Sequence, residues 1–156
     1  MPHTYVHFFG DGRDTAPASA KGYAEDLLTF LKSESYGELA TVIGRYYAMD
    51  RDKRWERIKI AVEGLVDGKG EETTDVLKTI QERYDSKETD EFLKPIIVKG
   101  VDGRIKEGDT LFFFNYRSDR MREIVSVIGL PDKPIEVNIP KDLVGYSSHR
   151  VCLTTD

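Results

Sequence analysis

The sequence predicts an α/β fold, a mainly parallel sheet with helices on both faces in a single domain. The first reason is that short apolar runs typical of strands alternate with longer stretches whose apolar residues recur at helical spacing. The second is that the strand–helix–strand spacing favours right-handed parallel crossovers. The third is length, because 156 residues are enough to build one domain with a substantial core.

The first unit of the chain is a strand followed by a helix and a second strand. The first strand is expected from about Thr4 to Phe9 and runs into a turn rich in glycine and aspartate. Ser19 is the expected N-cap of the helix. The apolar face of this helix is formed by Tyr23, Leu27, Phe30 and Leu31. Gly37 ends the helix, and the second strand is expected from about Glu38 to Ile43.

Two helices follow the second strand. Asp50 or Asp52 is expected to cap the first, which presents an apolar side to the core. That side is formed by Trp55, Ile58, Val62 and Leu65. Thr73 or Thr74 is expected to cap the second, shorter helix. The polar stretch 86–90 then reads as a loop.

The last part of the chain adds strands around one more helix. A short strand is expected over 95–98, and two close turns over 100–109 then form a small hairpin arm. The continuously apolar run 110–114 is typical of a strand buried on both faces. A helix is expected to start at Ser118 or Asp119. Its inward stripe is formed by Met121, Ile124, Val125 and Ile128.

Prolines shape the expectation for the C-terminal region. Pro131, Pro134 and Pro140 predict an irregular or edge-like segment up to about residue 148. A last strand is expected over 150–154. It contains the single cysteine, Cys152, which we expect to be a buried small apolar side chain. One cysteine excludes an intrachain disulfide and a multi-thiolate metal site.

Composition narrows the class of partner. The formal net charge of −5 and the pI near 5.3 argue against a broad nucleic-acid-binding surface. No apolar run approaches the roughly 18 residues that span a bilayer, so no membrane partner is expected. The N-terminus lacks the layout of a signal peptide, which favours a cytoplasmic protein.

Three segments place arginines and aspartates directly after strand-like runs, at 10–14, 44–52 and 115–120. Ligands of open α/β sheets bind beyond the carboxyl ends of the strands, so neighbouring parallel strands would bring these arginines to one anion site. Arg51 precedes one expected helix start, and Arg117 and Arg120 straddle another, where unpaired N–H groups already favour an anion. The alternative is that each arginine forms a structural ion pair with a neighbouring aspartate.

Other polar residues near these turns admit more than one reading. A carboxylate of Asp11 or Asp14 beside a bound hydroxyl could act as a general base. Ordinary turn chemistry is the better reading for Asp11, and for Asp14 the two readings are even. His7 is expected to be a satisfied sheet residue, and Tyr46 to pack rather than stack on a base, although it could line a pocket.

Machinery for breaking bonds is missing from the motifs. The sequence holds no glycine-flanked nucleophilic serine, no Walker sequence and no carboxylate–histidine cluster with metal spacing. The motifs therefore suit the binding of an anion, and none of them indicates a way to cleave a covalent bond.

Three segments resemble the cofactor-independent phosphoglycerate mutases: 11–15 (DGRDT), 44–57 (GRYYAMDRDKRWER) and 115–120 (NYRSDR). Asp90-Glu91-Phe92 followed by Pro95 is similar as well. The likeness extends over most of the chain and fades after about Gly129, and the long middle motif is highly specific.

The resemblance implies a two-domain enzyme of which residues 1–156 are the inserted, substrate-binding domain alone. The other domain, similar to alkaline phosphatase, carries a nucleophilic serine and two divalent metals, commonly manganese, and is absent here. The implied substrates are 2-phosphoglycerate and 3-phosphoglycerate, interconverted in glycolysis and gluconeogenesis. The implied substrate-binding residues are Arg13, Asp14, Arg45, Arg51, Arg117 and Arg120, and Asp14 is implied to move a proton on the substrate hydroxyl.

The departures from the family pattern limit what this polypeptide can do alone. It lacks the serine, the metal ligands, a substrate-binding histidine upstream of the first strand and a lysine from the phosphatase-like domain. We therefore expect a monomer without turnover of its own, whose partners are phosphoglycerate and the phosphatase-like domain of the same full-length chain. Two alternatives are a stand-alone binding module for a small phosphorylated acid and a domain whose arginines dock an acidic protein surface.

Overall fold

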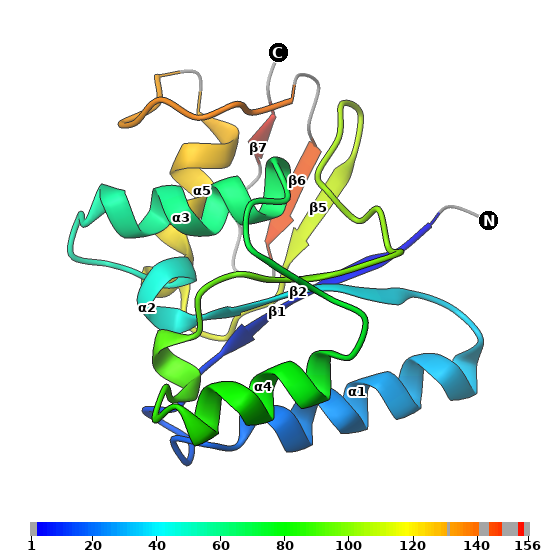
Figure 1. Cartoon of the computed structure of the whole chain (residues 1–156). Coiled ribbons are helices and arrows are strands. Elements are labelled where there is room, and N and C mark those ends of the chain that lie inside the picture. The colour runs from blue at the N-terminus through cyan, green and yellow to red at the C-terminus, as the bar shows by residue number, and fades with distance from the viewer. Residues whose placement is uncertain (1–2, 131, 141–143, 148–152, 155–156) are drawn as a thin grey trace.

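The structure, a computed structural model, describes residues 3–130, 132–140, 144–147 and 153–154 and contains two sheets and five α-helices (Figure 1). The strands are β1 (Tyr5–Gly10), β2 (Glu38–Gly44), β3 (Glu71–Thr73), β4 (Ile96–Val98), β5 (Thr110–Phe113), β6 (Val144–Ser147) and β7 (Leu153–Thr154). The helices are α1 (Ala20–Glu34), α2 (Arg45–Ala48), α3 (Trp55–Val66), α4 (Val76–Asp85) and α5 (Ser118–Gly129), with a 3-10 turn η1 (Asp90–Phe92).

The larger sheet confirms the α/β prediction. Its strand order is β1-β2-β4-β3, with β1 parallel to β2 and β3 parallel to β4, while β2 and β4 are antiparallel. The β1–β2 pairing ends with Gly10 opposite Gly44, so both strands deliver their following turns to the same edge of the sheet. This register puts the first two arginine segments side by side.

The third arginine segment follows a strand of a different sheet. β5 pairs in parallel with β6, and β6 pairs antiparallel with β7. The expectation that the three arginine-bearing strands are neighbours in one sheet is therefore wrong for β5. The partner strand, β6, lies in the region that the prolines led us to expect as irregular. It has only four residues, fewer than the usual strand, and therefore gives a weak local signal.

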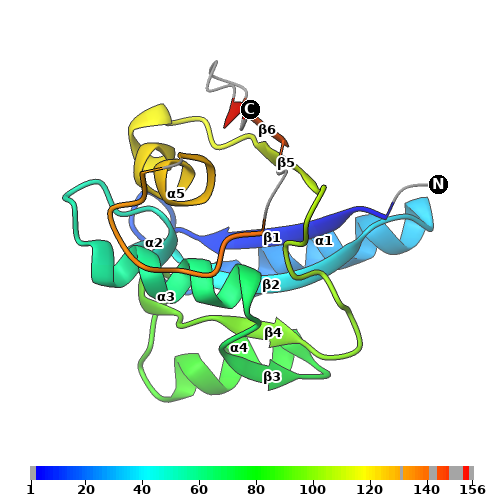
Figure 2. The ribbon, with the colours of Figure 1, turned by 90° about the horizontal axis from the view of Figure 1, so that it is seen from above.

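Helices cover both faces of the larger sheet, as predicted. Side chains alternate along a strand, so the adjacent residues Val42 and Ile43 point into different apolar clusters. The Val42 cluster is closed by α1 and α4, and the Ile43 cluster by α2, α3 and α5. Figures 1 and 2 show these helices on opposite sides of β1 and β2.

β5 is not buried on both faces, which corrects the prediction for residues 110–114. Leu111 and Phe113 pack against the core, whereas Phe112 and Phe114 are 62% and 73% exposed. Their rings stack with centroids 6.1 Å apart. An unbroken apolar run cannot by itself distinguish a strand covered on two faces from one whose outer aromatics face solvent.

The residue at the N-cap position is the predicted one for α1 and a different one for α3 and α4. Ser19 is the N-cap residue of α1, as predicted, although its side chain makes no capping bond. Asp75, not Thr73 or Thr74, caps α4 by accepting from the backbone N–H of Lys78 at 3.0 Å, because Thr73 belongs to β3. The N-cap of α3 is Arg54, not Asp50 or Asp52, because the chain makes one more turn before the helix; Asp50 stabilises that turn by accepting from the N–H groups of residues 52 and 54 at 3.0 and 2.9 Å.

Two remaining expectations concern single residues. His7 Nδ1 lies 2.9 Å from the Thr41 hydroxyl, and burial lowers the pKa of His7 to about 4, so it is a satisfied neutral sheet residue as predicted. Cys152 and the start of the predicted strand 150–154 lie outside the described residues, while Leu153–Thr154 forms β7.

Within the described ranges, no helix combines the length and apolar character that crossing a membrane requires.

Candidate functional site

The turn after β1 is folded around the carboxylate of Asp11. One oxygen of Asp11 accepts from the backbone N–H groups of Arg13 and Asp14, each at 3.2 Å. The Gly12 N–H donates to the hydroxyl of Thr15 at 3.2 Å, and Gly12 has φ = +66°, a backbone conformation that favours glycine. The turn thereby presents the carboxylates of Asp11 and Asp14 to the neighbouring turn.

Arg45 receives both carboxylates. It starts α2 directly after β2, is only 3% exposed, and donates through Nη1 to Asp11 and, at 3.0 Å, to Asp14. Burial alone would raise the pKa of Asp11, but the N–H of Asp14 and the Arg45 guanidinium outweigh it and hold that pKa below its usual value. Arg45 thus has ion-pair partners from another strand rather than from its own sequence neighbours.

The 3-10 turn η1 holds these two turns in place, and Asp90 is its anchor. Asp90 is fully buried and accepts from the backbone N–H groups of Ser19 and Ala20, both at 2.8 Å, which caps α1 from 70 residues away. The hydroxyl of Tyr84 donates to its other oxygen, and burial together with this bond raises the pKa of Tyr84. Sequence reasoning missed this role and assigned residue 90 to a polar loop.

Gly44 shows how closely η1 approaches the site. A Cβ atom at Gly44 would lie 2.4 Å from the carbonyl oxygen of Glu91 and 2.7 Å from that of Asp90. The Gly44 N–H donates to the Leu93 carbonyl at 2.7 Å. Backbone contacts this short require glycine where β2 turns into Arg45.

The start of α5 brings the third segment to the same place. Arg117 lies 3.9 Å from the Asp14 carboxylate, which joins the third segment to the first. Asp119 accepts from Arg51 at 2.8 Å and from Arg117 at 3.3 Å. These two guanidinium groups lower the pKa of Asp119 to about 2. The arginines therefore meet although β5 belongs to the second sheet.

Arg120 is the buried arginine of this cluster that pairs with no carboxylate among the described residues. It is 8% exposed, its Nη1 donates to the Met49 carbonyl at 3.1 Å, and its Nε has no hydrogen-bond partner among the described residues. Within the same ranges, no carboxylate lies within ion-pair distance of it. Burial lowers the pKa of Arg120, and so do the nearby charges of Arg45, Arg51 and Arg117.

The site as a whole carries an excess of positive charge. Its four guanidinium groups belong to Arg45, Arg51, Arg117 and Arg120, and its three carboxylates to Asp11, Asp14 and Asp119. A buried cation that lacks a carboxylate is costly unless an anion completes the site. Such a cluster is chemically suited to binding an anion, and the alternative of one structural ion pair per arginine does not account for Arg120.

Arg13 is the one predicted site residue whose side chain takes no part in the contacts described above. Its backbone donates to Asp11, but its exposed side chain makes no hydrogen bond or ion pair with any residue that the structure describes. Tyr46 packs as expected, with its ring 3.8 Å below the Arg57 guanidinium and 5.1 Å from the Phe92 ring.

The ion pairs at Asp119 predict a pH dependence of folding. Because the folded-state pKa lies below the ordinary value of 3.8, the stability that Asp119 contributes is present above pH 4 and is lost as pH falls toward 2. Asp119→Asn is expected to flatten the dependence of the urea unfolding midpoint on pH in this window. Asp26→Asn, an exposed aspartate on α1, serves as the control, and equal slopes for Asp119→Asn and wild type would contradict the prediction.

The described ranges offer no group of three or more histidine, cysteine, aspartate or glutamate side chains arranged to hold a metal ion. The divalent metals that the resemblance implies therefore find no ligand set among these residues.

Comparison with known proteins identifies close relatives. The family model described as the BPG-independent PGAM N-terminus matches residues 1–154. A 2,3-bisphosphoglycerate-independent phosphoglycerate mutase of Onchocerca volvulus is 50% identical over 161 residues, which cover 99% of this chain and 31% of the relative. The corresponding enzyme of Caenorhabditis elegans is 54% identical over 133 residues, which cover 83% of this chain and 25% of the relative.

A solved structure agrees with these relatives. The chain superimposes on a phosphoglycerate mutase of Leishmania mexicana, crystallised at low cobalt concentration, with a TM-score of 0.83 and 25% sequence identity. The superposition covers 92% of this chain and 28% of the other. The chain thus spans less than a third of the length of the curated relatives and of this structure.

Proposed function

From the premise that this chain belongs to the family of BPG-independent phosphoglycerate mutase N-termini, we propose that it holds phosphoglycerate during phosphoryl transfer. The reaction is the interconversion of 2-phosphoglycerate and 3-phosphoglycerate, an isomerase step of glycolysis and gluconeogenesis. The chain supplies the substrate-holding part, and the rest of a longer polypeptide supplies the transfer chemistry.

The observation that carries this proposal is the buried Arg120 with an unpartnered Nε. Phosphoglycerate bears a phosphate and a carboxylate on one three-carbon skeleton, and guanidinium groups pair bidentately with both. An anion bound beside Arg120 would balance the repulsion that it receives from three other arginines. Arg45 starts α2 and Arg51 follows it, whereas Arg117 and Arg120 belong to the start of α5, so we propose that the arginines contact two anionic groups from two directions.

The four clustered arginines have different surroundings, which suggests different roles. Arg45 is buried and fixed by two carboxylates, so it sets the geometry of the site. Arg51 and Arg117 are 42% and 49% exposed and share Asp119, so both can exchange this partner for a substrate anion. Arg13 is exposed and is proposed to reach the substrate only when it is bound.

Asp14 is proposed to move a proton on the substrate hydroxyl. Its carboxylate is 61% exposed, accepts from Arg45 at 3.0 Å and lies 3.9 Å from Arg117. A carboxylate held beside the cations that bind the substrate is placed to accept a proton from a nearby hydroxyl. We propose that this deprotonation activates the glycerate oxygen that takes back the phosphoryl group.

The transfer itself requires groups from polypeptide outside this chain. We propose that a serine nucleophile and two divalent metals, manganese in the family that the sequence resembles, belong to a phosphatase-like domain. When bound there, the metals would activate the serine and stabilise the transferred phosphoryl group. The isolated chain is accordingly proposed to bind substrate without turning it over, and a mutase assay with manganese should stay at the blank.

Calorimetric titration with 3-phosphoglycerate tests the proposal. The wild-type chain is expected to give a saturable binding heat. The variant Arg117→Ala is expected to bind about tenfold more weakly, because one charge-assisted pair with the ligand is lost. Arg122→Ala, on the exposed side of α5, should bind like wild type. Absence of any saturable response at millimolar ligand, or equal affinities for the two variants, would contradict the proposed site.

A further inference from the structure

Two buried carboxyl groups lie beside the arginine site without a role in it. Asp50 is 4% exposed and Glu123 is 6% exposed, the former just before Arg51 and the latter on α5. Glu123 accepts from the N–H of Lys53, the residue between the two whose N–H groups donate to Asp50, so both carboxyl groups bind the same short stretch of backbone. Two carboxylates this close inside a protein cannot both stay ionised at low cost, which favours a proton on one of them.

The hydrogen-bond donors around the pair decide which group carries it. Asp50 accepts from the N–H groups of residues 52 and 54 and faces the Arg57 guanidinium at 3.4 Å. Glu123 accepts only from the Lys53 N–H, at 2.7 Å through Oε1, and its buried Oε2 has no donor facing it within the described residues. The donors therefore stabilise an ionised Asp50 and leave Glu123 as the site of the proton.

We propose that Asp50 and Glu123 share one proton, carried on Glu123 Oε2 and donated to Asp50, and that this pair positions Arg51. With the proton in place, Oε2 becomes a donor and no polar atom of the pair is left unmatched. The pair fastens the segment 50–54 to α5, and Lys53 adopts the left-handed φ of +57° that brings its N–H to Glu123. Arg51 stands within this segment and reaches Asp119 on the same helix at 2.8 Å.

The electrostatic surroundings agree with this protonation. Burial and the charges of Asp50 and Asp52 raise the pKa of Glu123 above its ordinary value of 4.5, whereas the pKa of Asp50 is lowered. The charged groups that face the pair are Arg57 on α3 and Asp52 in the segment itself. Arg57 lies beside Asp50, so its positive charge favours an ionised Asp50 and agrees with a proton on Glu123.

The pH dependence of unfolding tests the shared proton independently of any ligand. Since Glu123 holds its proton more tightly when folded, wild type should lose stability as pH rises from 4.5 toward the raised pKa. Glu123→Gln supplies the donor and the acceptor at every pH, so its stability advantage over wild type should grow over this range. Glu25→Gln removes an exposed charge on α1 and should follow the wild-type slope. Parallel curves for wild type and Glu123→Gln would overturn the proposal.

A carboxyl signal provides a second test on the folded protein. Infrared spectra recorded between pH 4.5 and the raised pKa should contain a C=O stretch of a protonated carboxylic acid that is lost in Glu123→Gln and persists in Glu25→Gln. If the two variants give the same spectrum as wild type, Glu123 is ionised and the proposal fails.

The positioning role rests on the proposed function and has its own readout, the affinity for 3-phosphoglycerate. Glu123→Ala should weaken binding by about tenfold because the segment that carries Arg51 loses its anchor, while Glu123→Gln should restore wild-type affinity. If neither wild type nor Glu123→Gln binds 3-phosphoglycerate, the proposed function fails, but the unfolding and infrared tests still decide the shared proton. Equal affinities of wild type and Glu123→Ala would overturn the positioning role.

Discussion

Replacing Asp90 with alanine is expected to destabilise the chain by about 3 kcal/mol, or to lower its Tm by about 10 °C. The carboxylate of Asp90 is fully buried and accepts from the N–H groups of Ser19 and Ala20 and from the Tyr84 hydroxyl. Alanine would leave these donors without their charged acceptor, and an unsatisfied buried donor costs more than the bond itself gains. Urea unfolding monitored by circular dichroism measures the effect.

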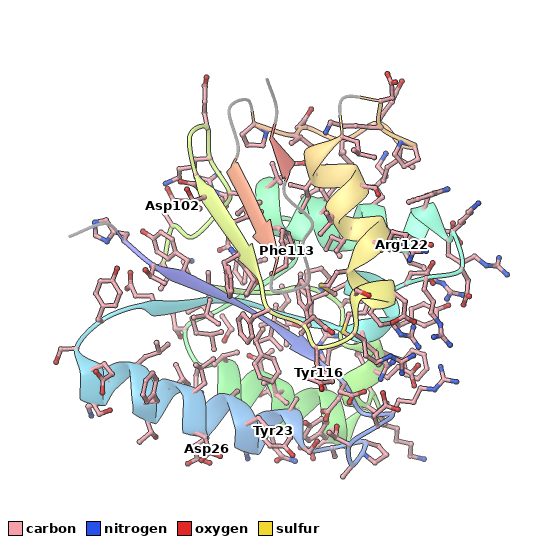
Figure 3. The ribbon with its side chains drawn as sticks, turned by 180° about the vertical axis from the view of Figure 1, so that it is seen from behind. Tyr23, Asp26, Asp102, Phe113, Tyr116 and Arg122 are labelled. Atoms are coloured by element: carbon pink, nitrogen blue, oxygen red, sulfur yellow. The ribbon has the colours of Figure 1, made fainter. Side chains whose placement is uncertain are left out.

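A matched control for this variant is Asp26→Ala. Asp26 lies exposed on the outer side of α1, the helix that Asp90 caps (Figure 3). It removes the same charge and should change stability by less than about 0.5 kcal/mol. Comparable losses in the two variants would mean that the cap from η1 does not stabilise α1.

Replacing Arg120 with methionine is expected to separate binding from folding. Methionine fills a similar apolar volume and removes a buried charge that has no carboxylate partner, so stability should stay unchanged or rise by about 1 kcal/mol. Binding of 3-phosphoglycerate should weaken by about a hundredfold, because the most buried free cation of the site is lost. Calorimetric titration and urea unfolding on the same sample measure the two effects.

Arg122→Met is the control for this separation. Arg122 stands two residues further along α5 and is exposed (Figure 3). It makes the same chemical change outside the site and should leave affinity within about twofold of wild type. A destabilised Arg120→Met with normal affinity would show that Arg120 is a structural residue, which contradicts its proposed role.

The local part of the site could be predicted from the sequence. The apolar run and turn before Arg45 predicted a strand whose end delivers that arginine, and the strand–helix–strand spacing predicted that β1 and β2 are parallel neighbours. The register that places Gly10 opposite Gly44 then brings Asp11 and Asp14 to Arg45. These features depend on periodicity and on turns, which short stretches of sequence specify.

The long-range part could not be predicted in the same way. β5 pairs with β6 more than 30 residues later, and the choice of sheet depends on contacts that no local pattern records. Asp90 was read as a loop residue because its partners, Ser19 and Ala20, are about 70 positions away. Glu123 gave no signal either, because its burial depends on the segment 50–54 folding over α5.

The direct test of the arginine site is an NMR titration that follows the Nε–H signals of the arginines during addition of 3-phosphoglycerate. The account predicts that the signals of Arg45, Arg51, Arg117 and Arg120 shift together along one saturation curve, while that of Arg122 stays in place. Signals that remain still, or that shift with unrelated midpoints, would contradict a single anion site shared by the three arginine segments.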